Sequence, residues 1–242
     1  MTSAPDSDAD APRRRTLYGR RQGKKLRAHQ QALLVDALPR LRLDVRHSLD
    51  PAEHAPLDLA AAFGRDMPGG YALEVGFGSG EHLVWQAARN PEIGFIGCEP
   101  YVNGVAKCLA QVEAEGLGNI RVFDDDARFV MAALPPASLV AAYVLFPDPW
   151  PKVRHHKRRF VCRENLDRLA TLLVPGAELR CATDDPSYLP WMVEHAVGHP
   201  AFEWLAEAPA DWRGRPADWP PTRYERKMLA GRKPVFLRLR RR

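Results

Sequence analysis

The 242-residue sequence lacks the features that would place it in several protein classes. No apolar run approaches the roughly 20 residues that a membrane-spanning helix needs. The polar, acidic start MTSAPDSDAD has no apolar centre typical of a signal peptide. The cysteines are scattered singly, without a C-x-x-C pair or a histidine at metal-ligand spacing. These absences favour a cytoplasmic protein with free thiols, no membrane association and no metal.

Acidic residues are absent from one stretch near the start, where residues 13–27 contain eight Lys or Arg. The net charge of the whole chain is only +5, so the distribution says more than the total. Short basic runs are most often solvated, and nucleic-acid binding is the alternative. We expect a disordered tail over residues 1–12, a basic N-terminal extension with a helix over residues 13–50, and the main domain over residues 51–242.

From residue 70 onward, apolar β-rich runs alternate with helical patterns. This order predicts a mostly parallel sheet covered on both faces, an α/β doubly wound Rossmann-like domain with an antiparallel C-terminal edge strand. Ligands bind such sheets where strand ends meet loops. The expected strands are 71–77, 93–99, 119–124, 138–146, 177–184 and 234–240, and the expected helices are 27–38, 81–90, 102–116, 127–134, 158–173, one through 191 and one near 224.

A glycine-rich turn, EVGFGSGEH, follows the first expected strand and opens a helix. Gly76, Gly78 and Gly80 would let the backbone approach a ligand, although a tight turn without a ligand is an alternative. A dinucleotide fingerprint needs glycine where Glu81 stands, and Glu74 and Glu81 would repel a pyrophosphate. The turn therefore favours a nucleoside that carries positive charge, and S-adenosyl-L-methionine fits that description.

Two further acids follow the next two strands. Glu99 ends the second strand, 19 residues beyond Gly80, where an acid typically accepts ribose hydroxyls. Asp126 ends a run of three acids after the third strand, where an adenine amine would arrive. Capping of the next helix is the competing role for this run, and one acid could do each job.

The stretch FPDPWPKVRHHKRR follows the fourth strand and joins a stiff acidic turn to a basic run. Its prolines fix the backbone, so the turn should hold Asp148 toward the methyl donor and present Trp150. Helix capping or an ion pair is the alternative for Asp148, and Trp150 either stacks on a base or packs. The candidates for gripping an anionic polymer are Arg154, His155, His156, Lys157, Arg158 and Arg159.

Two later segments offer substrate contacts. Asp184 ends the fifth strand and either caps the next helix or binds the N1 and amino edge of guanine. The residues Thr222 and Glu225 match a capping box, which leaves Arg223 and Tyr224 to contact substrate.

Taken together, five motifs resemble the tRNA (guanine-N7-)-methyltransferase family in order and spacing, from about Gly19 to the C-terminus. Val153 departs from the family pattern, which often has a basic residue there. The motifs are LEVGFGSGEHL, GCEPYVNGVAKCL, FPDPWPKVRHHKRR, ATDDPSY and TRYERK.

The resemblance implies a class I S-adenosylmethionine-dependent methyltransferase domain that modifies N7 of a guanine in tRNA, at position 46 of the variable loop. It also implies a role for each matching residue, with Asp148 catalytic. The implied cofactor contacts are Glu74, Glu99, Asp126 and Asp148, the implied substrate contacts are Lys152, Asp184, Thr222, Arg223, Tyr224 and Glu225, and the implied RNA contacts are residues 154–159.

Three rival interpretations remain. An exocyclic-amine RNA methyltransferase uses a related turn, but here Trp150 stands between Pro149 and Pro151. A nicotinamide oxidoreductase is disfavoured by Glu81. A catalytically silent RNA-binding protein would bind RNA without the cofactor.

Overall fold

The computed structural model describes residues 18–221 and 233–242. The described residues form a seven-stranded sheet in the order β3-β2-β1-β4-β5-β7-β6. Neighbouring strands from β3 to β5 run parallel, β7 is antiparallel to β5, and β6 is antiparallel to β7. The doubly wound α/β prediction with an antiparallel C-terminal strand is confirmed, but this strand, β7, is not at the edge of the sheet, because β6 pairs with its outer side. The strands are β1 Tyr71–Val75, β2 Gly94–Cys98, β3 Ile120–Phe123, β4 Leu139–Leu145, β5 Leu173–Thr183, β6 Phe202–Trp204 and β7 Val235–Arg241.

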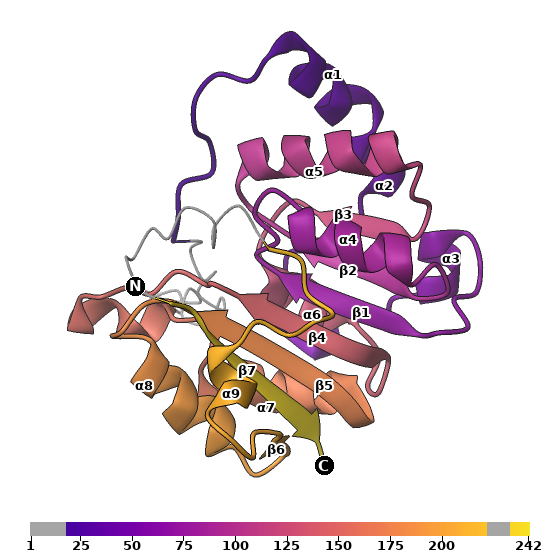
Figure 1. Ribbon diagram of the computed structural model, residues 1–242. Coiled ribbons are helices and arrows are strands. Elements are labelled where there is room, and N and C mark those ends of the chain that lie inside the picture. Colours follow the sequence, from indigo (N-terminus) through magenta and orange to yellow (C-terminus); the bar gives the residue numbers. More distant parts are fainter. Residues whose placement is uncertain (1–17, 222–232) are drawn as a thin grey trace, which may run out of the picture.

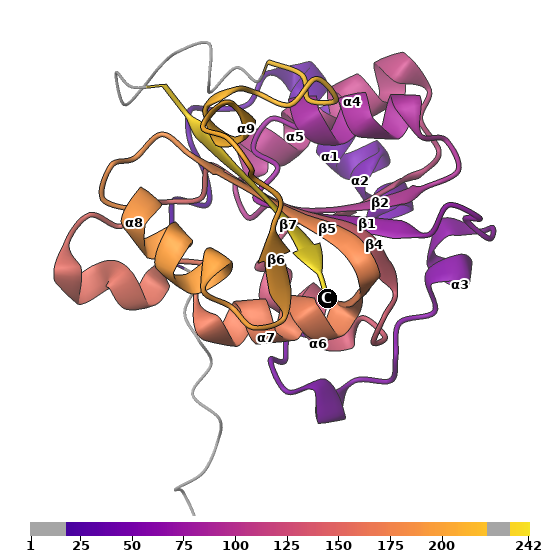
Figure 2. The same ribbon diagram turned by 60° about the horizontal axis from the view of Figure 1, so that its bottom comes forward.

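Helices cover both faces of the sheet (Figure 1). Figure 2 shows α4 (Glu81–Arg89) and α5 (Val102–Glu115) on one face, and α6 (Ala127–Ala133) and α7 (Arg163–Leu172) on the other. The N-terminal helix α1 (Ala28–Asp36) packs against α5. The shorter helices are α2 Leu38–Leu41, η1 Pro51–Glu53, α3 Leu59–Phe63, η2 Val153–Arg158, α8 Leu189–Met192, η3 Val193–Val197 and α9 Ala210–Arg213.

The alternation of side chains along β1 divides the core into two layers. Leu73 and Val75 belong to the cluster that includes α6 and α7 residues, whereas Ala72 belongs to the cluster that includes α4 and α5 residues. Since successive side chains of a strand point to opposite faces, Glu74 shares the face of Ala72. The carboxyl group of Glu74 therefore lies beneath α4.

Several predicted elements have different bounds in the structure. The helix expected from Arg158 begins at Arg163, because η2 is a separate 3-10 helix and Cys162 precedes α7 as its N-terminal cap. The first helix ends at Asp36, and Pro39 lies in the first turn of α2. Strand β5 runs through the expected turn at 175–176, and β6 had no predicted counterpart. The helix expected near residue 224 lies outside the described residues.

No helix in the described part of the chain has the length and apolar character that crossing a bilayer requires.

Candidate active site

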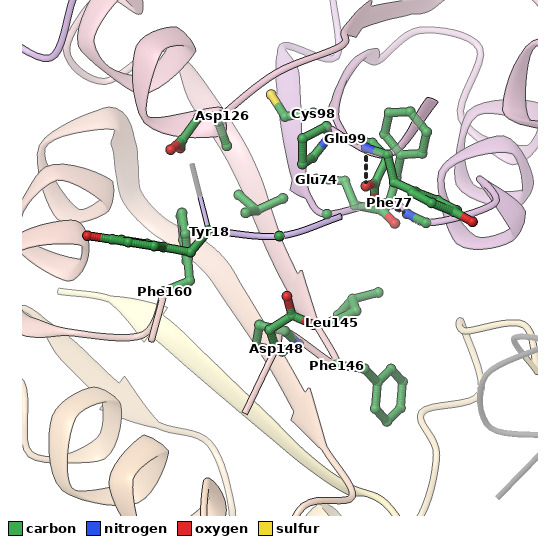
Figure 3. A pocket seen from close by; sticks show the side chains of 18 of the residues that line it. Tyr18, Glu74, Phe77, Cys98, Glu99, Asp126, Leu145, Phe146, Asp148 and Phe160 are labelled. Atoms are coloured by element: carbon green, nitrogen blue, oxygen red, sulfur yellow. Dashed lines mark hydrogen bonds between the residues drawn. The ribbon is translucent and has the colours of Figure 1, made fainter. Parts of the chain in front are cut away.

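A cavity of about 660 Å³ lies at the carboxyl ends of β1, β2 and β4. The sheet order reverses here, since β1 pairs with β2 on one side and with β4 on the other. Doubly wound sheets bind ligands at this switch point, and the volume suits a small molecule. Figure 3 shows four of the predicted acids around this space. They are Glu74, Glu99, Asp126 and Asp148.

The three glycines of the turn after β1 have two different tasks. Gly76 and Gly78 have φ of 71° and 57°, and both line the cavity. A Cβ at either would meet no described atom within 4 Å, so backbone conformation is what favours glycine there. Gly80 differs because its Cβ would lie 2.6 Å from Sγ of Cys108 in α5. Gly80 thus lets α4 and α5 approach each other, whereas the other two border the cavity.

Glu99 is anchored at the edge of the cavity by backbone donors. Its carboxylate accepts hydrogen bonds from the amides of Gly78 at 2.7 Å and Tyr101 at 2.9 Å. Desolvation raises the pKa of Glu99 to about 7, and the two backbone hydrogen bonds oppose that rise. The site therefore holds a carboxyl group whose charge is sensitive near neutral pH.

Asp126 caps α6, as the competing interpretation predicted. Its Oδ1 accepts a hydrogen bond from the amide of Arg128 at 3.0 Å, and its carboxylate also pairs with the Arg128 guanidinium. The preceding acid, Asp125, pairs with Arg21 at 3.2 Å. Capping does not remove Asp126 from the cavity, because its side chain also lines that space.

The turn after β4 has an unusual backbone. Phe146 and Trp150 have φ of 50° and 45°, in the left-handed region that non-glycine residues rarely adopt. Strain of this kind persists where the surroundings impose it, and it clusters at functional sites. Between these two residues Asp148 is exposed to the cavity, yet desolvation by the surrounding protein raises its pKa. The turn was predicted to be stiff and non-helical, and the structure confirms that it is non-helical.

Arg159 fixes this turn from within. Its side chain is buried, and Nε donates to the carbonyl oxygen of Pro149 at 2.8 Å. The same guanidinium donates to Oγ of Ser187 at 3.3 Å. These bonds turn the Arg159 guanidinium inward, and the residue also lines the cavity, so its predicted RNA contact stays a prediction.

The remaining basic residues of the segment separate into two groups. Lys152, Arg154 and Lys157 are exposed around η2. Arg158 instead lies over the rings of Tyr18 at 4.1 Å and Trp150 at 5.0 Å. Packing is thus the contact that the structure shows for Trp150, and stacking on a base stays a prediction.

The two histidines of η2 lie against tryptophan rings. The His155 ring is 6.0 Å from Trp150, and the His156 ring is 5.5 Å from Trp191. Across residues 18–221 and 233–242 no group of three or more His, Cys, Asp or Glu is placed to hold a metal ion. Phosphate contacts by these imidazoles remain a prediction.

The structure shows cap-like hydrogen bonds at the residue after Asp184, in the turn that precedes α8. Oδ1 of Asp185 accepts hydrogen bonds from the amides of Ser187 at 2.8 Å and Tyr188 at 3.0 Å. Recognition of guanine by Asp184 stays a prediction. The predicted contacts Thr222, Arg223, Tyr224 and Glu225 lie outside the described residues.

Nothing in the sequence indicated that residues 18–24, here called the N-terminal arm, reach the cavity. Asn103 in α5 holds the arm, because Oδ1 accepts from the Gly23 amide and Nδ2 donates to the Lys24 carbonyl, each at 2.7 Å. Figure 3 shows Tyr18 in the same space as Asp126 and Asp148. The arm residues that line the cavity are Tyr18, Gly19 and Arg20.

A second residue that sequence reasoning missed is His82 in α4. Its Nδ1 lies 2.8 Å from Oε2 of Glu74, and both side chains are buried. A lone histidine in a helix carries no recognisable motif, so only the fold reveals this pair.

Solved structures share the fold at low sequence identity. An rRNA methylase from Streptococcus thermophilus is 13% identical with a TM-score of 0.50, and the match covers 71% of this chain and 86% of that one. The 16S rRNA methyltransferase KamB is 17% identical with a TM-score of 0.50, over 78% of this chain and 96% of that one. These likenesses show a Rossmann-like methyltransferase fold.

Sequence comparisons are more specific. Residues 70–237 match the family model described as "Putative methyltransferase". A tRNA (guanine-N(7)-)-methyltransferase of Rhodospirillum rubrum is 49% identical over 100% of this chain and 91% of its own length. One of Brucella anthropi is 46% identical over 91% of this chain and 92% of its own length. The chain therefore belongs to the tRNA (guanine-N(7)-)-methyltransferase family.

Proposed function

We propose that this enzyme transfers a methyl group from S-adenosyl-L-methionine to N7 of a guanine in tRNA. The observation that carries the proposal is the ring of four acids around the switch-point cavity, directly beside an exposed basic helix. Full-length relatives that carry this activity in their names support it.

The cavity suits the proposed methyl donor. Gly76 and Gly78 leave open space beside the turn, and the surrounding carboxylates favour a ligand with positive charge. Glu99 would accept the ribose hydroxyls, Asp126 would accept the adenine amine, and Glu74 would face the cationic end. When bound, S-adenosyl-L-methionine supplies an electrophilic methyl group on a sulfonium.

The chemistry at guanine demands positioning more than proton transfer. N7 carries a lone pair and no proton, so no general base is needed for its attack. The purine becomes cationic as the new bond forms, and Asp148 stands on the strained turn where a carboxylate would offset that charge. The rigid turn fixes the carboxylate before reaction, which avoids reorganisation at the moment of transfer.

The exposed face of η2 supplies a surface for the tRNA backbone. Lys152, Arg154 and Lys157 are exposed, and Lys157 also lines the cavity. Phosphate contacts of this kind position nucleic acid without reading its sequence. The proposal takes position 46 in the variable loop as the target and the cytoplasm as the compartment, where tRNA is modified.

The direct test is methylation of an unmodified tRNA transcript followed by nucleoside identification. The proposal predicts 7-methylguanosine. A product methylated on an exocyclic amine would support the rival RNA methyltransferase, and RNA binding without any methyl transfer would support the silent RNA-binding protein.

A further inference from the structure

Glu74 and His82 form a buried acid–imidazole pair at the floor of the cavity. Both residues line the cavity, and Glu74 is 3% and His82 2% exposed. His82 lies between two aromatic rings, with centroid distances of 4.7 Å to Tyr143 and 5.0 Å to Trp219. A buried carboxylate without a hydrogen-bond partner is costly, and His82 supplies that partner.

The network around His82 determines which ring nitrogen carries the proton. The side-chain nitrogen Nε2 of Gln86 lies 2.8 Å from the carbonyl oxygen of Asp218. A carbonyl only accepts, so the amide nitrogen of Gln86 must face it. The same nitrogen lies 3.2 Å from Nε2 of His82, which therefore accepts. The proton of a neutral ring then sits on Nδ1 and is donated to Glu74.

We propose that His82 is a positioning residue for the methyl donor, whose neutral ring holds Glu74 as a carboxylate facing the cavity. A cationic imidazole would cancel the charge of Glu74, whereas the neutral ring orients the carboxylate and leaves its charge for a cationic ligand. The inference rests on the proposed use of S-adenosyl-L-methionine. Gln86 fixes the tautomer, and the Trp219 ring packs against the imidazole.

The first test compares two substitutions at this position. His82→Leu removes the donor, whereas His82→Asn places an amide N–H near the position of Nδ1. Calorimetry with S-adenosyl-L-methionine on the full chain should show binding weakened on the order of tenfold for His82→Leu and largely restored for His82→Asn. Affinity for tRNA without the cofactor should change less than about twofold, because phosphate contacts dominate it. Equal cofactor binding by His82→Leu and the unmodified protein would overturn the inference.

A double-mutant cycle tests whether His82 acts through Glu74. Glu74→Gln should weaken cofactor binding, and adding His82→Leu should weaken it by no more than about another twofold, because the two residues act as one unit. If the fold-losses of cofactor affinity in the two single variants multiplied in the double variant, His82 would act independently of Glu74, and the positioning role would be overturned.

The matched control is His199, a second buried histidine that bonds an acid. Its Nε2 lies 3.0 Å from Oδ1 of Asp167, and it lies outside the cavity lining. His199→Leu should lower the melting temperature without changing cofactor affinity. A matching loss of affinity in His199→Leu would show that the His82 effect reflects general destabilisation.

Nitrogen NMR of the unmodified protein gives a readout that needs no substitution. The inference predicts that Nδ1 of His82 is protonated and that Nε2 is not. A proton on Nε2 would overturn it even if every variant misfolded. If the unmodified protein bound no S-adenosyl-L-methionine, both the proposed function and this inference would be wrong. If it bound the cofactor normally but carried the His82 proton on Nε2, only the inference would be wrong.

Discussion

At the residue scale, the site is a set of carboxylates with unlike surroundings. Glu74 is buried against His82, Glu99 accepts two backbone hydrogen bonds, and Asp148 is exposed on a strained turn. Environment differentiates carboxylates that sequence alone treats as equivalent. Each acid therefore supports a different expectation on mutation.

Asp148→Asn should lower turnover by at least about tenfold, because the neutral amide cannot offset the charge that develops on the purine. The residue is exposed, so the free energy of unfolding should change by no more than about 0.5 kcal/mol. Steady-state kinetics with circular dichroism would measure both. Asp66→Asn, at another exposed acid, is the control, and turnover of Asp148→Asn equal to that of the control would refute the catalytic role.

Cofactor affinity should depend on pH through Glu99. Desolvation raises its pKa to about 7, and ribose hydroxyls bind the ionised form, so binding below that pH must first remove a proton. Affinity should therefore fall about tenfold from about pH 8 to about pH 6. Calorimetry across this range should show the fall in the unmodified protein and in Asp148→Asn, but not in Glu99→Gln. A flat profile in the unmodified protein would rule out this linkage.

At the element scale, the basic segment differs most from its sequence interpretation. Residues 153–158 form the separate helix η2, and α7 begins five residues later than expected, after its N-terminal cap Cys162. Between the two helices, Arg159 turns inward and bonds the Pro149 carbonyl oxygen. Charge patterning identified the segment but carried no information about which cations face solvent. That division depends on the neighbouring turn and on Tyr18, which is 132 positions away from Trp150 in the chain.

Replacing Arg154 and Lys157 by Ala should weaken binding to any tRNA and flatten the dependence of log affinity on log salt. The slope should fall by up to about 0.7 to 0.9 for each phosphate group that the variant no longer binds. Filter binding across salt concentrations would measure it. The control replaces Arg65 and Arg89, two exposed cations outside the cavity lining. The same slope in both double variants would mean that η2 is only a solvated surface.

At the scale of the whole molecule, the alternating apolar runs were sufficient to predict β1 to β5 along the chain, their mostly parallel sheet and the location of the site at the strand ends. The period of the hydrophobic pattern and the residues typical of turns are local features of the sequence, so they predict helices, strands and their connections well. The N-terminal arm could not be predicted, because its contacts with Asn103 and the cavity join segments about 80 positions apart. The Glu74–His82 pair was missed for a related reason: it requires knowing which face of β1 lies beneath α4.

The arm should loosen when its anchor is removed. Asn103→Ala deletes the hydrogen bonds to the Gly23 amide and the Lys24 carbonyl, so trypsin should cleave after Arg20, Arg21 or Lys24 several-fold faster. The melting temperature should change little, since Asn103 is only half-buried and bonds a short terminal segment. Mass spectrometry would measure the rate of cleavage at these sites. An unchanged rate would show that other contacts hold the arm.

Attack by guanine N7 is tested most directly with tRNA transcribed with 7-deazaguanine. This substrate replaces the reacting nitrogen with carbon and keeps the Watson–Crick edge, the sugar and the phosphates. We expect nearly normal binding, because phosphate contacts dominate affinity, and no methyl incorporation. Methylation of the deaza substrate at a rate near that of normal tRNA would contradict attack by N7 and would assign Asp148 a proton-accepting role at an exocyclic amine.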